Sequence, residues 1–389
     1  MMNKTLYLIK LGEIALKGQN RGLFEKRLKD NIKYKLRPYS NRLLRQKGRL
    51  FLEVDGEAPL ATIHHALATT FGIVGFARAI KCNKELDAIT RSAIELTSQE
   101  HFLEGTATFK VESRRSDKSF PLDSYGLSAH LGGAILKAQE GLKVSVREPD
   151  RTLYVEIRDQ AYLYYSPKGG LGGLPVGSAG RGMLLLSGGI DSPVSGYLMA
   201  KRGLKLEAVY YHTYPYTSDE ARGKVVSLAE SLSPYLNSLV LHIIPFTPIQ
   251  LHIAATSPVR EHTLLMRACM MRIANLLATE RSCQAIITGE SLSQVASQTV
   301  ESLAFTNSLS TLPVFRPLIG LDKGVIIDMA KEIGTYETSI LPFDDCCTLF
   351  SPKHPVVRPN LETLRESYAK MAIEGLYSEA LEKREELHL

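Results

Sequence analysis

Hydrophobic positions in the second half of the chain fall into short, nearly continuous runs separated by longer amphipathic stretches. The runs predict buried strands, and the stretches predict helices. The predicted strands are 183–187, 206–212, 239–244 and 284–289, and the predicted helices are 192–202, 219–232, 259–281 and 323–333. Because continuous apolar strands alternate with helices, the pattern predicts an α/β domain whose parallel sheet is covered on both faces.

The first half of the chain alternates shorter strands and helices, which predicts two small α+β units. For the first unit we expect strands at 5–12, 49–56 and 72–80 and helices at 20–36 and 59–70. For the second unit we expect helices at 86–97 and 124–138 and strands at 106–115, 142–150 and 151–166. The last two strands are predicted to lie on either side of a turn at Pro149 and Asp150.

A glycine-rich segment separates the two halves. Residues 166–182 contain seven glycines and two prolines, a composition typical of a linker. We therefore expect an N-terminal domain at 1–75, a second domain at 76–166, a linker at 167–180 and a C-terminal domain at 181–389.

Composition narrows the class of protein. The chain has 389 residues, of which 44% are hydrophobic and 23% are charged, which excludes a disordered, collagen-like or disulfide-scaffold protein. No apolar stretch approaches the ~18 residues of a membrane-spanning helix, and Lys10 and Glu13 interrupt any signal peptide. Five scattered cysteines favour a reducing compartment, so we expect a cytoplasmic protein without membrane contact.

Positive charge is concentrated near the N-terminus. Between Lys10 and Arg49, thirteen Lys and Arg residues face three acids, a local net charge of +10 against +6 for the whole chain. This distribution predicts contact with a polyanion, most simply nucleic acid. A solvated helix face with extended lysines is the alternative.

The segment SGGIDS, residues 187–192, carries the strongest chemical signal. It leads from a buried strand into a helix, where glycines and free N–H groups form a phosphate cradle. It matches neither a Walker A loop nor a dinucleotide fingerprint. It resembles the PP-loop of ATP pyrophosphatases, which cleave ATP between the α and β phosphates. Asp191 is predicted to hold Mg²⁺ through the phosphates, with helix capping as its alternative role.

A second signal is the adjacent thiol pair Cys346 and Cys347. No further ligand cluster completes a zinc site. We therefore interpret the pair as reactive thiols that accept and pass on sulfur, with two inert buried cysteines as the alternative. Cys269 and Cys283 lie in or beside an apolar helix and are expected in the core, and Cys82 has no partner motif.

With both signals in place, the chain resembles the tRNA 4-thiouridine synthetase family, ThiI, over essentially its whole length. The resemblance rests on six segments: LGEIALKGQNR, residues 109–136, SGGIDSPVSGYLMAKRG, YYHTYPYTSDEARGKV, GESLSQVASQT and CCTLFSPKHP. It implies a C-terminal PP-loop ATP pyrophosphatase domain preceded by a ferredoxin-like domain and a THUMP RNA-binding domain.

The resemblance also implies site residues. ATP is expected to contact Leu185, Leu186, Ser187, Gly188, Gly189, Asp191, Ser192, Tyr210, Tyr211, Arg267, Gly289 and Gln298, and Lys323 is expected to assist the phosphate chemistry. The tRNA is expected to contact Lys17, Arg21, Arg27, Arg114, Arg115 and Lys118.

The implied reaction has two steps: O4 of uridine 8 attacks the α-phosphate of ATP, and a cysteine persulfide then delivers sulfur to C4. Alignment of the segment CTLFS with the family favours Cys347 as the sulfur carrier. Counting forward from Lys323 favours Cys346, so both cysteines remain candidates. The chain ends too soon for the rhodanese-like domain of some members, so we expect a cysteine desulfurase to load the pair directly. That departure puts the family's thiamine role in doubt.

Separate modules could also act across a homodimer. The alternative classes are an amidating PP-loop ligase and a non-catalytic THUMP tRNA-binding protein. The thiol pair counts against the ligase, and the intact Asp191 and Ser192 count against the second class.

Overall fold

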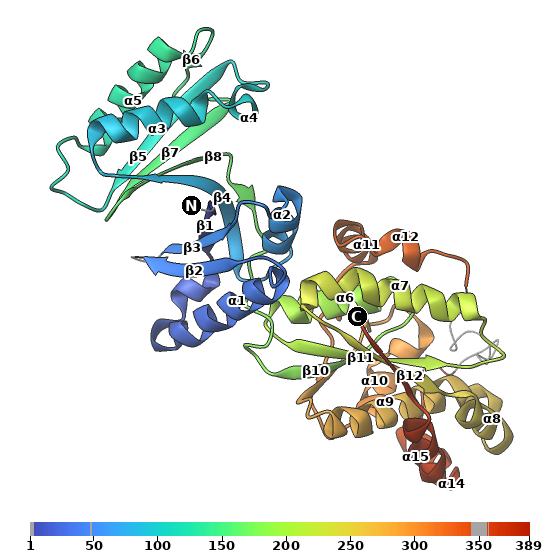
Figure 1. The fold of residues 1–389 in the computed structure, drawn as a ribbon. Helices are drawn as coiled ribbons and strands as arrows, with labels where there is room; N and C mark the ends of the chain where they lie inside the picture. The colour runs from blue at the N-terminus through green and yellow to red at the C-terminus, as the bar shows by residue number, and fades with distance from the viewer. Residues whose placement is uncertain (1–3, 47–48, 344–355, 357) are drawn as a thin grey trace. The chain divides into compact units, whose positions relative to one another are not determined.

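The computed structural model describes residues 4–46, 49–343, 356 and 358–389 (Figure 1). The chain divides into two compact units, Met1–Gly173 and Leu174–Leu389. None of the helices in these described ranges is long and apolar enough to cross a membrane.

A single nine-stranded sheet runs through the whole first unit, in the order β2-β3-β1-β4-β8-β7-β5-β6, with β9 also paired to β4. Its strands are β1 (Lys4–Leu11), β2 (Asn41–Gln46), β3 (Arg49–Asp55), β4 (Ile73–Cys82), β5 (Thr108–Arg115), β6 (Lys143–Val144), β7 (Arg151–Ile157), β8 (Ala161–Tyr165) and β9 (Lys168–Gly169). Strand β4 joins the two halves, because it pairs with β1 up to Ala79 and with β8 from Ala79 onward. The expected boundary after residue 75 therefore falls inside a strand.

Helices cover one face of this sheet in two groups (Figure 1). The first core lies under α1 (Arg21–Lys35) and α2 (Leu60–Ala68), after the 3-10 turns Glu13–Leu16 and Gly18–Asn20. The second lies under α3 (Leu86–Thr97) and α5 (Ser124–Ala138), beside the short α4 (Glu100–Leu103). A smaller apolar cluster joins the two halves on another part of the sheet, where the rings of Phe51 and Tyr162 stack at 4.5 Å.

The predicted strand pair around Pro149 and Asp150 is wrong. Strand β6 is only two residues long and pairs in parallel with β5, while the hairpin forms between β7 and β8. The Asp150 carboxylate accepts hydrogen bonds from the backbone N–H groups of Ala107 and Thr108, at 3.0 and 2.7 Å. These bonds fasten the turn to the start of β5, so residues 145–150 do not pair with β7.

The second unit contains the predicted parallel sheet, in the order β14-β13-β10-β11-β12-β15. Its strands are β10 (Arg181–Leu185), β11 (Lys205–His212), β12 (Val240–Pro245), β13 (Ala285–Ile287), β14 (Val314–Phe315) and β15 (Glu385–His388). Only β15 is antiparallel to its neighbour. The order reverses between β10 and β13, which is where open α/β sheets bind ligands.

Helices cover both faces of this second sheet, as predicted (Figure 1). One group consists of α6 (Asp191–Lys201), α7 (Asp219–Leu236), α11 (Lys323–Glu332) and α12 (Tyr336–Ser339). The other consists of α8 (Thr247–Thr256), α9 (His262–Glu280), α10 (Val300–Asn307), α14 (Leu361–Lys370) and α15 (Glu374–Glu382), with 3-10 turns at Val259–Glu261 and Ala296–Gln298. The predicted helix at 259–281 therefore begins as a 3-10 turn.

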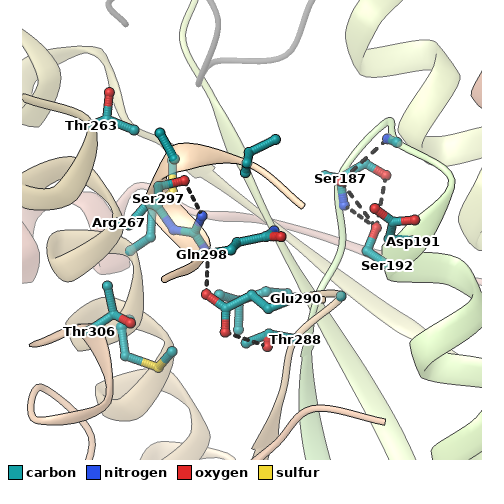
Figure 2. Close-up of a pocket in the computed structure, with 17 residues that line it drawn as sticks. Ser187, Asp191, Ser192, Thr263, Arg267, Thr288, Glu290, Ser297, Gln298 and Thr306 are labelled. Atoms are coloured by element: carbon teal, nitrogen blue, oxygen red, sulfur yellow. Dashed lines mark hydrogen bonds and ion pairs between the residues drawn. The ribbon is translucent and has the colours of Figure 1, made fainter. Parts of the chain in front are cut away.

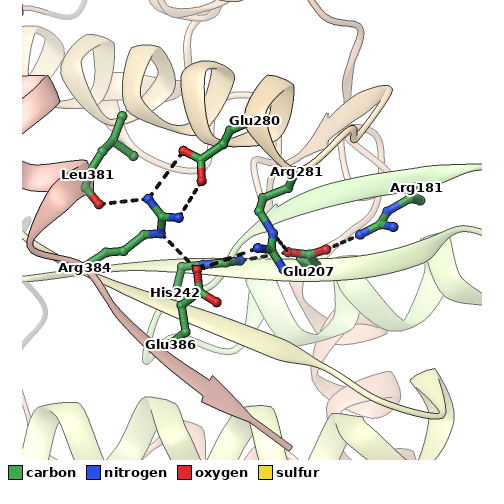
Figure 3. Close-up of polar contacts among 8 residues, drawn as sticks. All are labelled: Arg181, Glu207, His242, Glu280, Arg281, Leu381, Arg384 and Glu386. Carbon is green, nitrogen blue, oxygen red and sulfur yellow. Dashed lines mark hydrogen bonds and ion pairs between the residues drawn. The ribbon is translucent and has the colours of Figure 1, made fainter.

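A buried ionic network holds the edge strand β15 (Figure 3). Glu207 of β11 is 3% exposed. It accepts hydrogen bonds from Arg181 and from Arg281 Nε, the latter at 2.8 Å, and it lies 2.9 Å from His242 Nε2. The other His242 nitrogen lies 3.3 Å from Glu386 of β15. Burial opposes ionisation of Glu207, but its hydrogen bonds with His242 and Arg281 outweigh burial and lower its pKa to about 2.

We predict that Glu207→Ala destabilises the protein by about 2–3 kcal/mol at pH 7, because the buried His242 and the partly exposed Arg181 and Arg281 lose their shared hydrogen-bond partner. The matched control is Glu280→Ala, whose carboxylate is 47% exposed and pairs with Arg384, and this change should cost at most about 1 kcal/mol. Urea unfolding measures both values. An equal loss of unfolding free energy in the two variants would contradict the view that Glu207 is the central residue of this network.

The Glu207 carboxylate also makes the stability of the fold depend on pH. Its folded pKa of about 2 lies below the ordinary 4.5, so its stabilisation is present above pH 4.5 and declines as the pH falls toward about 2. We expect Glu207→Gln to lose less stability than the wild type over that interval. Unfolding curves recorded between these two pH values test the difference.

Candidate active site

The phosphate-cradle segment folds around a pair of serines at the carboxyl end of β10. The Ser192 hydroxyl accepts the Ser187 backbone N–H at 2.9 Å, and the two hydroxyls lie 3.1 Å apart. The Ser187 hydroxyl also accepts the N–H of Gly189 at 3.3 Å. Helix α6 starts at Asp191, so this turn leaves the N-terminal N–H groups of the helix at the mouth of the cradle (Figure 2).

The end of β13 packs directly against the start of α6. A Cβ on Gly289 would lie 2.8 Å from the backbone nitrogen of Ser192 and 2.9 Å from its Cα. One turn into the helix, the buried Ser195 hydroxyl donates to the Thr288 carbonyl at 3.0 Å. Only glycine allows this approach without moving the helix, so Gly289 fixes the position of the cradle against the neighbouring strand.

A cavity of about 470 Å³ opens beside the cradle (Figure 2). Its wall is formed by strand β10, helices α6, α9 and α10 and the segment after β13. The lining residues are Leu185, Ser187, Gly189, Asp191, Ser192, Thr263, Arg267, Met270, Met271, Thr288, Gly289, Glu290, Val295, Ala296, Ser297, Gln298 and Thr306. Polar groups from the cradle thus share the cavity with apolar side chains such as Met270 and Met271 of α9, an arrangement typical of small-molecule sites.

Arg267 enters this cavity from α9 and is held by two side chains of the segment after β13. Its Nη1 donates to the Ser297 hydroxyl at 2.7 Å, and its Nη2 contacts the Glu290 carboxylate. Glu290 also accepts hydrogen bonds from Arg316 Nε at 2.7 Å and from the Thr288 hydroxyl at 2.9 Å. Burial opposes the charge on Glu290, but Arg267 and Arg316 outweigh burial and lower its pKa.

Asp191 and Lys323 form an ion pair next to the cradle. Lys323 Nζ lies 2.5 Å from Asp191 Oδ1, and Gln294 Nε2 donates to Asp191 Oδ2 at 2.9 Å. Lys323 is the first residue of α11, so the fold joins residues far apart in the sequence. No cluster of three or more His, Cys, Asp or Glu side chains suited to a metal occurs within the described residues.

Most of the predicted ATP contacts meet at this cavity. Eight of them line it: Leu185, Ser187, Gly189, Asp191, Ser192, Arg267, Gly289 and Gln298. The other four are absent from the lining: Leu186, Gly188, Tyr210 and Tyr211. Tyr211 is 5% exposed and its hydroxyl donates to the carbonyl of Met270, so it supports a residue of the wall.

Sequence reasoning missed several polar residues of the site, namely Thr263, Glu290, Gln294, Ser297, Thr306 and Arg316. Three of them, Glu290, Gln294 and Ser297, lie in the segment GESLSQVASQT, from which sequence analysis named only Gly289 and Gln298 as ATP contacts. Glu290 could have been found from its position, because it is a carboxylate that directly follows a buried strand and Gly289. Nothing in the local sequence marks Arg316.

The thiol pair Cys346 and Cys347 lies outside the described residues. On the N-terminal side of the pair, the described part of the chain ends at Phe343, shortly after α12. The hydroxyl of Ser339, the last residue of α12, donates a hydrogen bond to the Gly189 carbonyl at 3.4 Å. Cys269 and Cys283 are buried, as expected, and burial raises their pKa values to about 12 and about 11. Cys82 is half-buried, and its pKa is also raised by burial.

The predicted RNA contacts in the first unit differ in exposure. Arg27, Arg114 and Lys118 are exposed, and the Arg114 side chain is 72% exposed although it pairs with Glu112. The remaining three predicted contacts are engaged within the fold: Lys17 pairs with Glu13, Arg21 pairs with Glu25, and Arg115 donates to the carbonyls of Lys118 and Phe120.

Sequence analysis also missed a basic cavity in the first unit. It measures about 880 Å³, and its charged lining residues are Lys4, Glu53, Arg78, Lys81, Glu95, Arg151 and Lys168. Five cations against two carboxylates give this cavity a positive potential.

A parallel sheet with a serine-glycine cradle at its switch point defines the second unit as a nucleotide-binding α/β domain of the PP-loop type. Family models agree along the chain: thiamine biosynthesis protein (ThiI) matches residues 177–373, the ThiI ferredoxin-like domain matches 6–77, and the THUMP domain matches 83–165. The chain belongs to the ThiI family.

Relatives resemble the chain over nearly its full length. It is 48% identical to a probable tRNA sulfurtransferase of Caldanaerobacter subterraneus subsp. tengcongensis, covering 95% of this chain and 96% of the relative. It is 44% identical to a probable tRNA sulfurtransferase of Acetivibrio thermocellus, covering 99% and 98%. A crystal structure of a 4-thiouridine synthetase–RNA complex with bound ATP superposes with a TM-score of 0.91 at 35% identity, covering 100% of both chains.

We predict that Gly289→Ala lowers the affinity for ATP by at least about tenfold, because the new methyl group displaces the start of α6. The matched control is Gly320→Ala, since a Cβ there would meet nothing within 4 Å. Isothermal titration calorimetry gives both affinities. Wild-type affinity in Gly289→Ala would show that the close packing does not shape the binding site.

Proposed function

We propose that this protein is an ATP-dependent tRNA sulfurtransferase that makes 4-thiouridine at position 8 of tRNA. The observation that carries the proposal is the full-length similarity to a 4-thiouridine synthetase, which was solved with RNA and ATP. The cradle and its cavity would hold ATP within the second unit, and the exposed cations Arg27, Arg114 and Lys118 of the first unit would contact RNA.

The cavity contains groups suited to both ends of ATP. The Gln298 side-chain oxygen is buried, and within the described residues it has no hydrogen-bond partner. A buried acceptor without a partner is costly, and the 6-amino group of adenine would satisfy it. At the other end, the cradle N–H groups, the α6 N-terminus and Arg267 would bind phosphate oxygens.

Asp191 fits the role of a Mg²⁺ ligand. Mg²⁺ typically binds one or two carboxylates together with substrate phosphates, and the Asp191 carboxylate lies at the mouth of the cradle. When bound, the ion would offset negative charge on the phosphates. Gln294 and Lys323 hold the carboxylate in place from two sides.

The reaction follows from these groups in two steps. The O4 oxygen of the uracil attacks the α-phosphorus, a bond to the adenylate forms, and pyrophosphate leaves. Arg267 and Lys323 would stabilise the charge that develops on the phosphates. The terminal sulfur of a cysteine persulfide then attacks C4, and AMP leaves with the former O4 oxygen, so the carrier cysteine is joined to the base through an S–S bond. A second thiol then attacks the carrier sulfur, which breaks that bond, releases 4-thiouridine and leaves a disulfide.

The sulfur carrier is Cys347 or Cys346, loaded by a cysteine desulfurase. The contact between Ser339 of α12 and Gly189 supports this role, because it places the chain that leads to the thiols beside the cradle. The other thiols are poor carriers, since burial raises the pKa of Cys82, Cys269 and Cys283 and disfavours the thiolate.

We predict that Cys347→Ala still releases pyrophosphate from ATP with unmodified tRNA but forms no 4-thiouridine in the presence of a desulfurase and cysteine. The matched control is Cys82→Ala, which should keep both activities. Mass spectrometry of the tRNA nucleosides measures the product. Thiolation at the wild-type rate in Cys347→Ala, and its loss in Cys346→Ala, would transfer the carrier role to Cys346.

The same assay tests the function itself. Pyrophosphate release should require tRNA and should not respond to ammonia with small acceptors. Release that ignores tRNA and depends on ammonia would contradict the thiolation proposal and favour an amidating ligase.

We also predict that combined alanine substitution of Arg27, Arg114 and Lys118 weakens tRNA binding and reduces the slope of log affinity against log salt concentration by about two to three. The control is Lys370→Ala in α14, whose side chain is 78% exposed. Filter binding over a salt series gives the slopes. An unchanged slope in the triple variant would remove these residues from the RNA surface.

A further inference from the structure

Glu290 lies between two arginines at the wall of the cavity. It contacts Arg267 on one oxygen and accepts from Arg316 Nε, at 2.7 Å, on the other (Figure 2 shows the Arg267 side). Its side chain is 6% exposed, and those of Arg316 and Arg267 are 14% and 19% exposed. Three charges are therefore fixed together in a site largely shielded from water.

The charges in this group do not cancel. Two guanidinium groups and one carboxylate leave a net charge of +1. Arg267 and Glu290 line the cavity, while Arg316 lies outside the lining. Arg316 is fastened on its far side, where Nη1 donates to Asn307 at the end of α10 at 3.1 Å. Surplus buried positive charge favours binding of an anion at the exposed end of the group.

We propose that Glu290 and Arg316 are positioning residues, in which Glu290 orients Arg267 toward the triphosphate of ATP and Arg316 balances Glu290 so that the positive charge of Arg267 remains available. This inference rests on the proposed function. Without Arg316, Arg267 and Glu290 would form a neutral pair. Without Glu290, the two guanidinium groups would repel each other and Arg267 would lose its orientation.

Three variants separate charge from orientation. Arg316→Met changes the net charge of the group from +1 to 0, Glu290→Gln changes it to +2, and the double variant returns it to +1. We expect Arg316→Met to weaken ATP binding about tenfold. Glu290→Gln should lower kcat about tenfold without raising the KM for ATP.

The double variant gives the sharpest test. If charge balance sets affinity, Glu290→Gln combined with Arg316→Met should bind ATP within about threefold of the wild type. If both residues only support the fold, the two losses should add, and the double variant should bind worst. Restored affinity supports the proposal, and additive losses overturn it.

Two controls address structure. Arg316→Lys keeps the charge and should retain most of the affinity lost in Arg316→Met. Arg384→Met removes an ion-paired arginine of similar exposure, 19%, from the β15 network and should leave ATP binding unchanged. Failure of Arg316→Lys to recover affinity, or an equal loss in Arg384→Met, would overturn the charge argument.

Calorimetric ATP binding and tRNA-dependent pyrophosphate release are measured on the same preparations. A wild-type protein that binds ATP but releases no pyrophosphate with tRNA would contradict the proposed function, and binding alone would then decide the charge inference. A wild-type protein that is active, with unaltered binding and kinetics in all three variants, would contradict only the inference.

Discussion

The site depends on the close approach of one helix to one strand. Helix α6 can begin beside β13 only because Gly289 has no side chain, and the Ser195 hydroxyl then ties the helix to the Thr288 carbonyl. That contact fixes the cradle formed by Ser187 and Ser192. It also places the first turn of α6 beside the segment after β13, from which Glu290 and Gln294 reach Arg267 and Asp191.

The electrostatics of the site follow a common plan. Within the described part of the chain, two cations beside the cradle have a carboxylate partner: Lys323 pairs with Asp191, and Arg267 pairs with Glu290. Fixed partners hold long side chains in place before a ligand binds, so less reorganisation is required when the phosphates arrive. Each carboxylate also has a second partner: Gln294 donates to Asp191, and Arg316 donates to Glu290. These second partners limit how strongly each carboxylate competes with the ligand for its cation.

Sequence patterns predicted the parts of the fold that depend on local burial. The apolar runs of β10, β11 and β12 and the helices α3 and α5 were located well, because each buries a face that the pattern reveals. The polar edge strands β2 and β15 were missed, since edges need no apolar run. Within the site, Ser187, Asp191 and Ser192 were found because they are contiguous. Arg316 and Gln294 were not, because only the tertiary fold joins them to Glu290 and Asp191.

The first unit shows why its domain boundary was placed inside a strand. Strand β4 continues without a break from the part that pairs with β1 to the part that pairs with β8, and both pairings form one sheet. The stacked rings of Phe51 and Tyr162 add an apolar contact between the two halves. Because backbone hydrogen bonds and side-chain packing both cross the boundary, the ferredoxin-like and THUMP parts share one framework. The cations that we propose as RNA contacts, Arg27 in α1 and Arg114 in β5, are therefore carried by parts of the chain that share one sheet.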